Sequence, residues 1–235
     1  MKPVASHRRN TLGHSQMHVP RNGHTLKGDP FIVKRTFLAL AGALLLASGA
    51  FPALAATSID VPVVASAPSL DPKAPTFGGA VATLSWDATN AQKANEPATV
   101  HVTSDSKYLY VRFDAPQSEP LIGAAGGDSV AIDLWPSGST GDRYRLGIEL
   151  TGSHTADSTA NTASWEGAAV SHPGGYTVTM KIPTSALAGS SNSQVQFSRW
   201  ISSTATQQVW SHGSPSSDDV GQAGTMTLTG TVGKN

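Results

Sequence analysis

The chain has 235 residues, with 16 Lys and Arg, 16 Asp and Glu and no cysteine. The lack of cysteine excludes disulfides, thiol chemistry and a lipoprotein anchor. Seven basic residues but only one acidic residue precede position 57, so residues 57–235 carry nine basic and fifteen acidic side chains, a formal charge of −6. This acidic, sparsely charged composition argues against a nucleic-acid partner and against an anionic membrane surface.

The first 56 residues do not have the pattern of a folded domain. Residues 1–32 show no apolar period, and we expect an unstructured extension or a start codon placed too early. Residues 33–56, "VKRTFLALAGALLLASGAFPALAA", combine a short basic segment, an apolar run and small residues. This is the pattern of a signal peptide cleaved near Ala55 or Ala56. An uncleaved anchor is the alternative, but Ala and Gly make the run weakly apolar and Pro52 interrupts it.

The remaining chain is predicted to be all-β. Residues 57–80 are expected to form an opening strand or linker, and residues 81–235 a single domain. Short alternating segments separated by turn residues are expected at 99–102, 108–113, 130–135, 144–150, 176–182, 195–201, 207–211 and 225–229. Strands at this spacing predict one antiparallel β-sandwich, of jelly-roll or immunoglobulin-like type. The stretches 152–164 and 213–224 are expected to be long loops, and Thr184–Leu187 one short turn.

The hairpin "GGDSVAIDLWPSGSTGDRYRLGIEL", residues 126–150, carries the most informative pattern. Pairing that is symmetric about Ser139 places Asp133 opposite Arg145. Val130, Ile132 and Leu134 then share the core face, while Asp133 and Trp135 share the other. We therefore expect Trp135 on an open face, beside an ion pair between Asp133 and Arg145.

The sequence contains few motifs that indicate catalysis or metal binding. No nucleophile elbow, zinc-protease motif or phosphate-binding loop is present, so we expect no enzyme. Asp128, Asp133, Asp142 and Asp157 could hold Ca²⁺, although the EF-hand spacing is absent. His101, His154, His172 and His212 lack metal-ligand spacing to one another. A haem would need Met180 or Met226 with a histidine as axial ligands, but Met180 shares the apolar face of its strand and is expected in the core.

Five tryptophans stand in this weakly charged domain: Trp86, Trp135, Trp165, Trp200 and Trp210. Flat aromatic rings stack on the C–H faces of sugars, and neighbouring polar groups can bind the hydroxyls. Core packing is the alternative for each ring, because tryptophan is usually well buried.

The order of several motifs resembles a known family. These are "YLYVRF", "DSVAIDLWP", "RYRLGIEL", "SWEGAAV", "GGYTVTMKIPTSAL", "VQFSRW", "VWSHG" and "GTMTL". Over residues 86–229 they are similar to the carbohydrate-binding module family 9-like domains, relatives of the DOMON β-sandwiches. The resemblance implies a jelly-roll-like sandwich, export and sugar binding, often with bound calcium; wider relatives bind haem.

Two departures from the family pattern concern the sugar site. The family strand reads D-x-V-E, but Ala131 replaces the glutamate, and residues 123–127 lack the aromatic expected there. Arg145 matches the family's arginine, and Trp210 matches its late-loop aromatic.

Together these patterns predict an exported, non-catalytic module that binds an oligosaccharide or polysaccharide. The predicted sugar-binding residues are Trp135, Trp210, Arg145, Asp133 and Trp165. The protein is expected to be secreted or periplasmic, monomeric and not embedded in a membrane. A DOMON-type haem-binding electron-transfer domain, or a structural or partner-binding envelope module, is the alternative.

Overall fold

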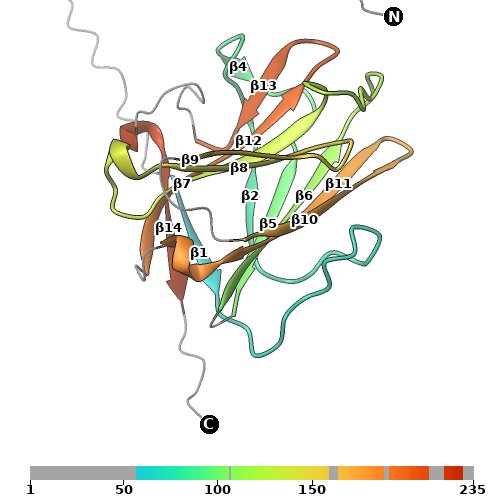
Figure 1. Cartoon of the computed structure of the whole chain (residues 1–235). Coiled ribbons are helices and arrows are strands. Elements are labelled where there is room, and N and C mark those ends of the chain that lie inside the picture. Colours follow the sequence, from blue (N-terminus) through green and yellow to red (C-terminus); the bar gives the residue numbers. More distant parts are fainter. Residues whose placement is uncertain (1–56, 106, 159–163, 188–190, 212–219, 230–235) are drawn as a thin grey trace, which may run out of the picture. The chain divides into compact units, whose positions relative to one another are not determined.

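The computed structural model describes residues 57–105, 107–158, 164–187, 191–211 and 220–229. The expected leader and amino-terminal extension lie outside these residues. The described residues form two packed β-sheets (Figure 1) and contain no α-helix. No helix among them is long and apolar enough to span a membrane.

The larger sheet has nine strands. They are β1 (Ser58–Pro62), β3 (Trp86–Asp87), β4 (Gln92–Lys93), β7 (Ser129–Trp135), β8 (Tyr144–Glu149), β9 (His154–Ser158), β12 (Asn192–Ile201), β13 (Thr206–Val209) and β14 (Gly224–Thr229). Their order is β4-β3-β13-β12-β7-β8-β9, with β14 beside β12 and β1 beside β14. All pairs in this sheet are antiparallel except β1 with β14.

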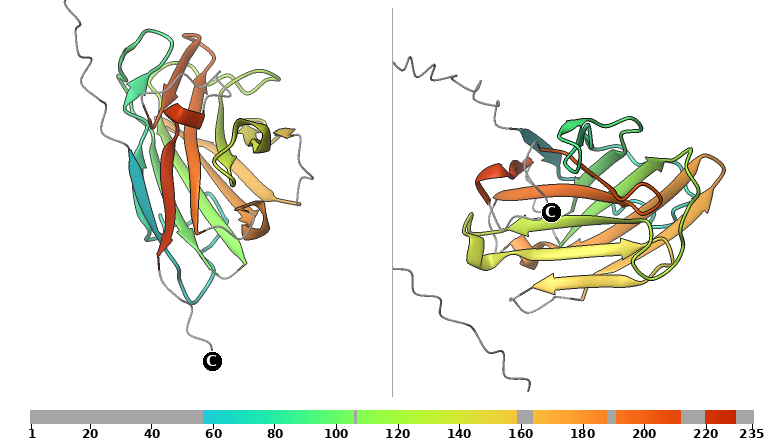
Figure 2. Two further views of the ribbon diagram at one scale, coloured as in Figure 1. Left: turned by 90° about the vertical axis from the view of Figure 1, so that its left-hand side faces the viewer. Right: turned by 90° about the horizontal axis from the view of Figure 1, so that it is seen from above.

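The smaller sheet has five antiparallel strands. Their order is β10 (Glu166–His172), β11 (Gly175–Pro183), β6 (Tyr108–Pro116), β5 (Thr99–Ser104) and β2 (Ala80–Thr83). The turned views show the strands of the two sheets as two layers (Figure 2). Three short 3₁₀ helices, η1 (Thr140–Asp142), η2 (Thr184–Leu187) and η3 (Val220–Gln222), complete the described elements. The predicted antiparallel β-sandwich and the short turn at Thr184–Leu187 are therefore confirmed.

Alternation along the strands builds the core between the sheets. In β6, Leu109, Val111 and Phe113 are fully buried and belong to the main apolar cluster, as the sequence predicts. From the other sheet, Phe197 meets Phe113 edge-on, with ring centroids 6.1 Å apart. Met180 is also completely buried in this cluster, in agreement with its expected place. An apolar core of this kind stabilises a chain that has no disulfide.

The β7–β8 hairpin has the predicted register. Asp133 pairs with Arg145, and Val130, Ile132 and Leu134 lie in the core. Two expectations about loops were incomplete. Strand β9 lies inside the stretch 152–164, and η3 lies inside 213–224. Strand β9 depends on its pairing with β8, and η3 is a single turn closed by the N–H of Ala223 on the carbonyl of Val220, so neither has an apolar pattern that marks it.

Candidate functional site

The outer face of the nine-stranded sheet carries the predicted ion pair. Asp133 is 2% exposed. Its carboxylate accepts hydrogen bonds from Nη1 of Arg145 at 3.0 and 3.2 Å, and Nε of Arg143 lies 3.5 Å from Oδ1. The expected pair is present, and a second arginine adds to it. Because the side chain of Arg145 is 29% exposed, its remaining nitrogens can still donate to a ligand.

Gln196 is the buried neighbour of this pair on β12. It pairs with Asp133 across the strands. Its side-chain oxygen accepts the backbone N–H of Ser211 at 3.1 Å, and its amide nitrogen lies within hydrogen-bond distance of the Ser211 hydroxyl. Gln196, Ser211 and Asp133 are all buried, so this part of the face is a satisfied polar layer.

Trp135 is not the open platform that its strand position predicts. It points away from the main apolar cluster, as expected, but it is only 3% exposed. Its indole Nε1 is buried and has no hydrogen-bond partner among the described residues. The expectation of an open face was wrong because alternation tells which side of a sheet a residue takes, not whether that side is covered.

Trp210 lies on the opposite side of the same sheet. It is 8% exposed and belongs to the apolar cluster between the sheets. Its ring lies 5.4 Å from that of Phe197, and its backbone N–H donates to the carbonyl of Phe197. Trp210 directly follows β13, and its side chain points into the core between the sheets. The expectation of an aromatic wall at Trp210 was therefore wrong. Trp135 and Trp210 are therefore separated by the sheet.

Trp165 lies at the edge of the sandwich. It is half-buried and stacks on His154, with ring centroids 4.3 Å apart and planes inclined by 18°. Nε2 of His154 lies 3.2 Å from the carbonyl oxygen of Gly167 in β10, so this pair links the edges of the two sheets. The structure thus brings together Asp133, Arg145 and Trp135, but neither Trp165 nor Trp210 joins them.

A different aromatic patch stands on the accessible part of the outer face. Trp200 of β12 is half-buried and pairs with Gln207 on one side and Ser129 on the other. Glu149 pairs with Ser129 one strand further. These side chains and Trp86, which lies two strands from β12 on the same face, are all partly exposed. We call Trp86, Ser129, Glu149, Trp200 and Gln207 the Trp200 patch.

The Trp200 patch has the chemistry of a sugar-binding surface. An indole ring offers an apolar plane, and an amide, a hydroxyl and a carboxylate flank it within the same row of the sheet. Sequence reasoning missed Trp200, although the signal that singled out Trp135 was present. Phe197 and Ile201 alternate with polar residues in this strand, and Trp200 occupies an outward position.

A polar pocket adjoins this end of the sheet. It has a volume of about 310 Å³ and is lined by acidic and amide side chains that include Asn90, Gln92, Glu119 and Gln208. Gln208 pairs with Arg199 and Gln207 pairs with Trp200, so alternation along β13 puts Gln208 on the opposite face from the Trp200 patch. Side-chain amides can donate to and accept from hydroxyl groups, and carboxylates can accept from them, so a hydroxyl-rich ligand fits this pocket.

Three of the four predicted calcium ligands can be placed. Asp128 is completely buried, and its carboxylate accepts N–H groups of Ile122 and Ser202, each at 2.8 Å. Asp133 is held by arginines, and Asp142 accepts from Ser139. Within the described ranges, no group of three or more His, Asp or Glu side chains is arranged to hold a metal.

Buried polar groups also link the two sheets at this end. Arg199 is fully buried. Its guanidinium donates to Oε1 of Gln117 at 2.8 Å and to the carbonyl of Glu96 at 3.2 Å, and it lies 5.4 Å from the ring of Tyr176. Burial raises the pKa of Tyr176 to about 12, against the effect of Arg199, so Tyr176 is neutral over the physiological range.

Solved structures of other proteins have a similar fold. A family 9 carbohydrate-binding module from Caldicellulosiruptor kristjanssonii in complex with cellotriose has a TM-score of 0.58 and 16% identity, covering 74% of this chain and 95% of that chain. The complex of such a module with glucose has a TM-score of 0.59 and 14% identity, covering 75% and 98%. The fold is that of a family 9 carbohydrate-binding module.

A third solved structure agrees with this family 9-like fold. It is a candidate carbohydrate-binding protein from Bacteroides uniformis, with a TM-score of 0.54 and 13% identity, covering 74% of this chain and all of that chain. A scan against protein-family models finds no match, and neither does a search of curated proteins. The similarity is therefore one of fold, carried by the strand pattern rather than by sequence identity.

In this domain, Ala131 takes the position at which the resemblance expects a glutamate. Ala131 is 6% exposed and pairs with Gly147 of β8. A Cβ atom at Gly147 would lie 2.5 Å from Oγ1 of Thr155 and 3.2 Å from the carbonyl oxygen of Val130. Close packing of small residues thus occupies this place on the outer face, which directs attention to the Trp200 patch.

Proposed function

We propose that the chain is an exported, non-catalytic carbohydrate-binding domain that holds a glycan against the Trp200 patch. The observation that carries the proposal is the row Gln207–Trp200–Ser129–Glu149, an accessible indole with hydrogen-bonding side chains beside it. Two solved complexes of a module with this fold hold cellotriose and glucose, which supports the ligand class. The pattern of residues 33–56 supports export.

Arg145 stays in the proposal as a polar partner at the far side of the same face. It lies two strands from Trp200, about 10 Å, and four residues further along, about 13 Å at the spacings of a β-sheet. A single sugar unit at Trp200 does not reach that far. We therefore propose that the ligand is an oligosaccharide or polysaccharide, with Trp200 and Trp86 as the aromatic contacts.

A glycan array tests the ligand class, and tryptophan fluorescence then tests the surface. We expect soluble oligosaccharides from the array to change the fluorescence of the wild type and of Trp165→Ala, but not to bind Trp200→Ala. Trp165 is the matched control because it is another half-buried tryptophan, placed at the sandwich edge. An array without any bound glycan would overturn the proposed function. Loss of binding in Trp165→Ala alone would place the ligand elsewhere.

A further inference from the structure

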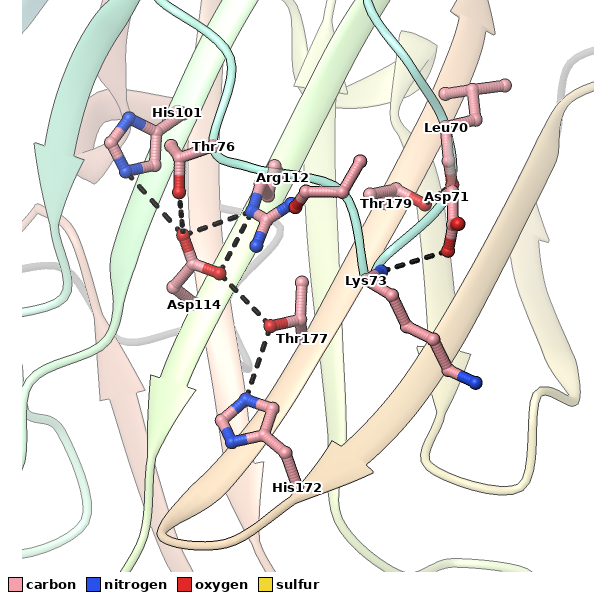
Figure 3. A network of polar contacts seen from close by, with 11 residues as sticks. Leu70, Asp71, Lys73, Thr76, His101, Arg112, Asp114, His172, Thr177 and Thr179 are labelled. Atoms are coloured by element: carbon pink, nitrogen blue, oxygen red, sulfur yellow. Dashed lines mark hydrogen bonds and ion pairs between the residues drawn. The ribbon is translucent and has the colours of Figure 1, made fainter.

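The outer face of the five-stranded sheet holds a second pocket. The segment between β1 and β2 crosses this face, as Figure 3 shows. The hydroxyl of Thr179 donates to the carbonyl of Leu70 at 2.6 Å, and Nη1 of Arg112 donates to that of Ala74 at 2.8 Å. Beside these anchors, Pro72 and Lys73 of the segment, strands β6 and β11 and the β10–β11 turn enclose a pocket of about 530 Å³. We call it the Arg112 pocket.

Arg112 is the buried charge in this pocket. The residue is 7% exposed. Its Nε atom donates to both oxygens of Asp114, at 2.9 and 3.1 Å, and Nη1 is held by Ala74. Nη2 has no hydrogen-bond partner among the described residues, yet it is not one of their fully buried unsatisfied atoms. One edge of the guanidinium is therefore fixed by the protein while Nη2 remains accessible at the pocket.

The charged side chains that line the pocket are Arg112, Lys73 and Asp114, two cations and one anion. Asp114 is neutralised by Arg112, and it also accepts a hydrogen bond from the Thr177 hydroxyl at 3.1 Å. Burial lowers the pKa of His101 against the attraction of Asp114, so His101 adds no charge at pH 7. The exposed ammonium group of Lys73 then stands beside an ion pair that is already complete.

His172 lies at the wall of the pocket, and both of its ring nitrogens face protein oxygens. Its Nε2 atom lies 3.3 Å from Oγ1 of Thr177, and its Nδ1 atom lies 3.2 Å from the carbonyl of Pro173. When Thr177 donates to Asp114, its oxygen can accept from His172. The chain Asp114–Thr177–His172, which Figure 3 displays, thus fixes the ring at the pocket wall.

The other part of the wall is apolar. It is lined by Pro72, Pro116 and Val170. A ligand with an anionic group at one end and C–H surface at the other matches both parts, because a guanidinium fixed in place binds carboxylates through directed hydrogen bonds, and ligand sites combine apolar walls with a few placed polar groups.

We propose that the Arg112 pocket binds the carboxylate of an acidic sugar of the uronic acid class, with Arg112 and Lys73 as its cationic partners. The site lies on the opposite sheet from the Trp200 patch, so it is independent of the proposed function. It would give the domain a second contact with an acidic polysaccharide.

Calorimetric titration of the full chain with sodium glucuronate, glucose and sodium sulfate at one ionic strength tests this proposal. We expect glucuronate to bind, and glucose and sulfate to bind at least about tenfold more weakly, because each lacks one half of the matching chemistry. Equal binding of glucose would overturn the role of the carboxylate. Equal binding of sulfate would overturn the assignment to a sugar, and no binding of glucuronate would overturn the site.

Variants locate the site. Lys73→Ala removes an exposed side chain and should weaken glucuronate binding about tenfold, whereas Lys107→Ala, an exposed lysine at the β5–β6 turn, should leave it unchanged. Arg112→Lys keeps the charge but loses the planar fork, and it should abolish binding. Equal affinities of the two alanine variants would contradict the proposal even if Arg112→Lys fails to fold. Trp200→Ala should bind glucuronate like the wild type, which separates this site from the Trp200 patch.

Discussion

Replacement of Trp210 by alanine distinguishes a core residue from a sugar platform. Trp210 is 8% exposed and packs against Phe197. A tryptophan buries about 200 Å² of surface, which corresponds to about 5 kcal/mol at 25 cal/mol per Å². Large-to-small changes at buried aromatic residues cost about 3–5 kcal/mol. For a domain of this size, we expect the melting temperature to fall by about 6–20 °C.

Urea unfolding and thermal melts measure this loss, and Gly224 provides an internal check. A Cβ atom at Gly224 would clash with the Trp210 ring and approach the carbonyl oxygen of Thr57 to 2.8 Å. Gly224→Ala should therefore destabilise the wild type by about 1–3 kcal/mol, and by less in the Trp210→Ala background. An unchanged melting temperature of Trp210→Ala, together with lost glycan binding, would refute the core assignment.

Three further predictions concern charged side chains. Hydrogen bonds from the Tyr110 hydroxyl and from the N–H groups of Lys107 and Tyr108 outweigh burial, which opposes them, and lower the pKa of Asp105 below 3.8. The charged carboxylate therefore stabilises the fold above about pH 4. In urea titrations, the wild type should have a higher free energy of unfolding than Asp105→Asn, and this difference should shrink as the pH falls further. A difference that does not change with pH would contradict this. In Arg145→Ala, the buried carboxylate of Asp133 keeps only Arg143 as a cationic neighbour. Chemical unfolding should show a free energy of unfolding lower by about 1–3 kcal/mol, and an unchanged value would mean that the pair does not contribute to stability. Because Asp128, Asp133 and Asp142 are held by protein donors, EDTA should leave the melting temperature unchanged, and a drop of several degrees would reveal a bound cation.

Local periodicity was sufficient to predict the β7–β8 hairpin of the larger sheet. The period of two assigns Val130, Ile132 and Leu134 to one face, and the turn between the strands fixes the register of Asp133 with Arg145. The same reasoning assigned the correct side to Trp135 but not its exposure. Exposure depends on segments that pack over the sheet, and their positions are long-range information.

Arg199 shows what strand alternation alone does not explain. Its inward position follows from the period of β12, but a charged side chain in the core needs partners. The partners are Gln117 and Glu96, 82 and 103 residues away in the sequence. Strands β3 and β4 have two residues each, so their structure depends on pairing with a neighbour and leaves no periodic signal. The Arg112 pocket depends in the same way on a segment that folds back across β6 and β11.

Binding of an oligosaccharide at the Trp200 patch is the central claim, and calorimetric titration of the best glycan from the array tests it most directly. The wild type and Trp165→Ala should bind alike, while Trp200→Ala should bind at least about tenfold more weakly with a melting temperature that remains above that of Trp210→Ala. Equal binding by Trp200→Ala and the wild type would contradict the claim.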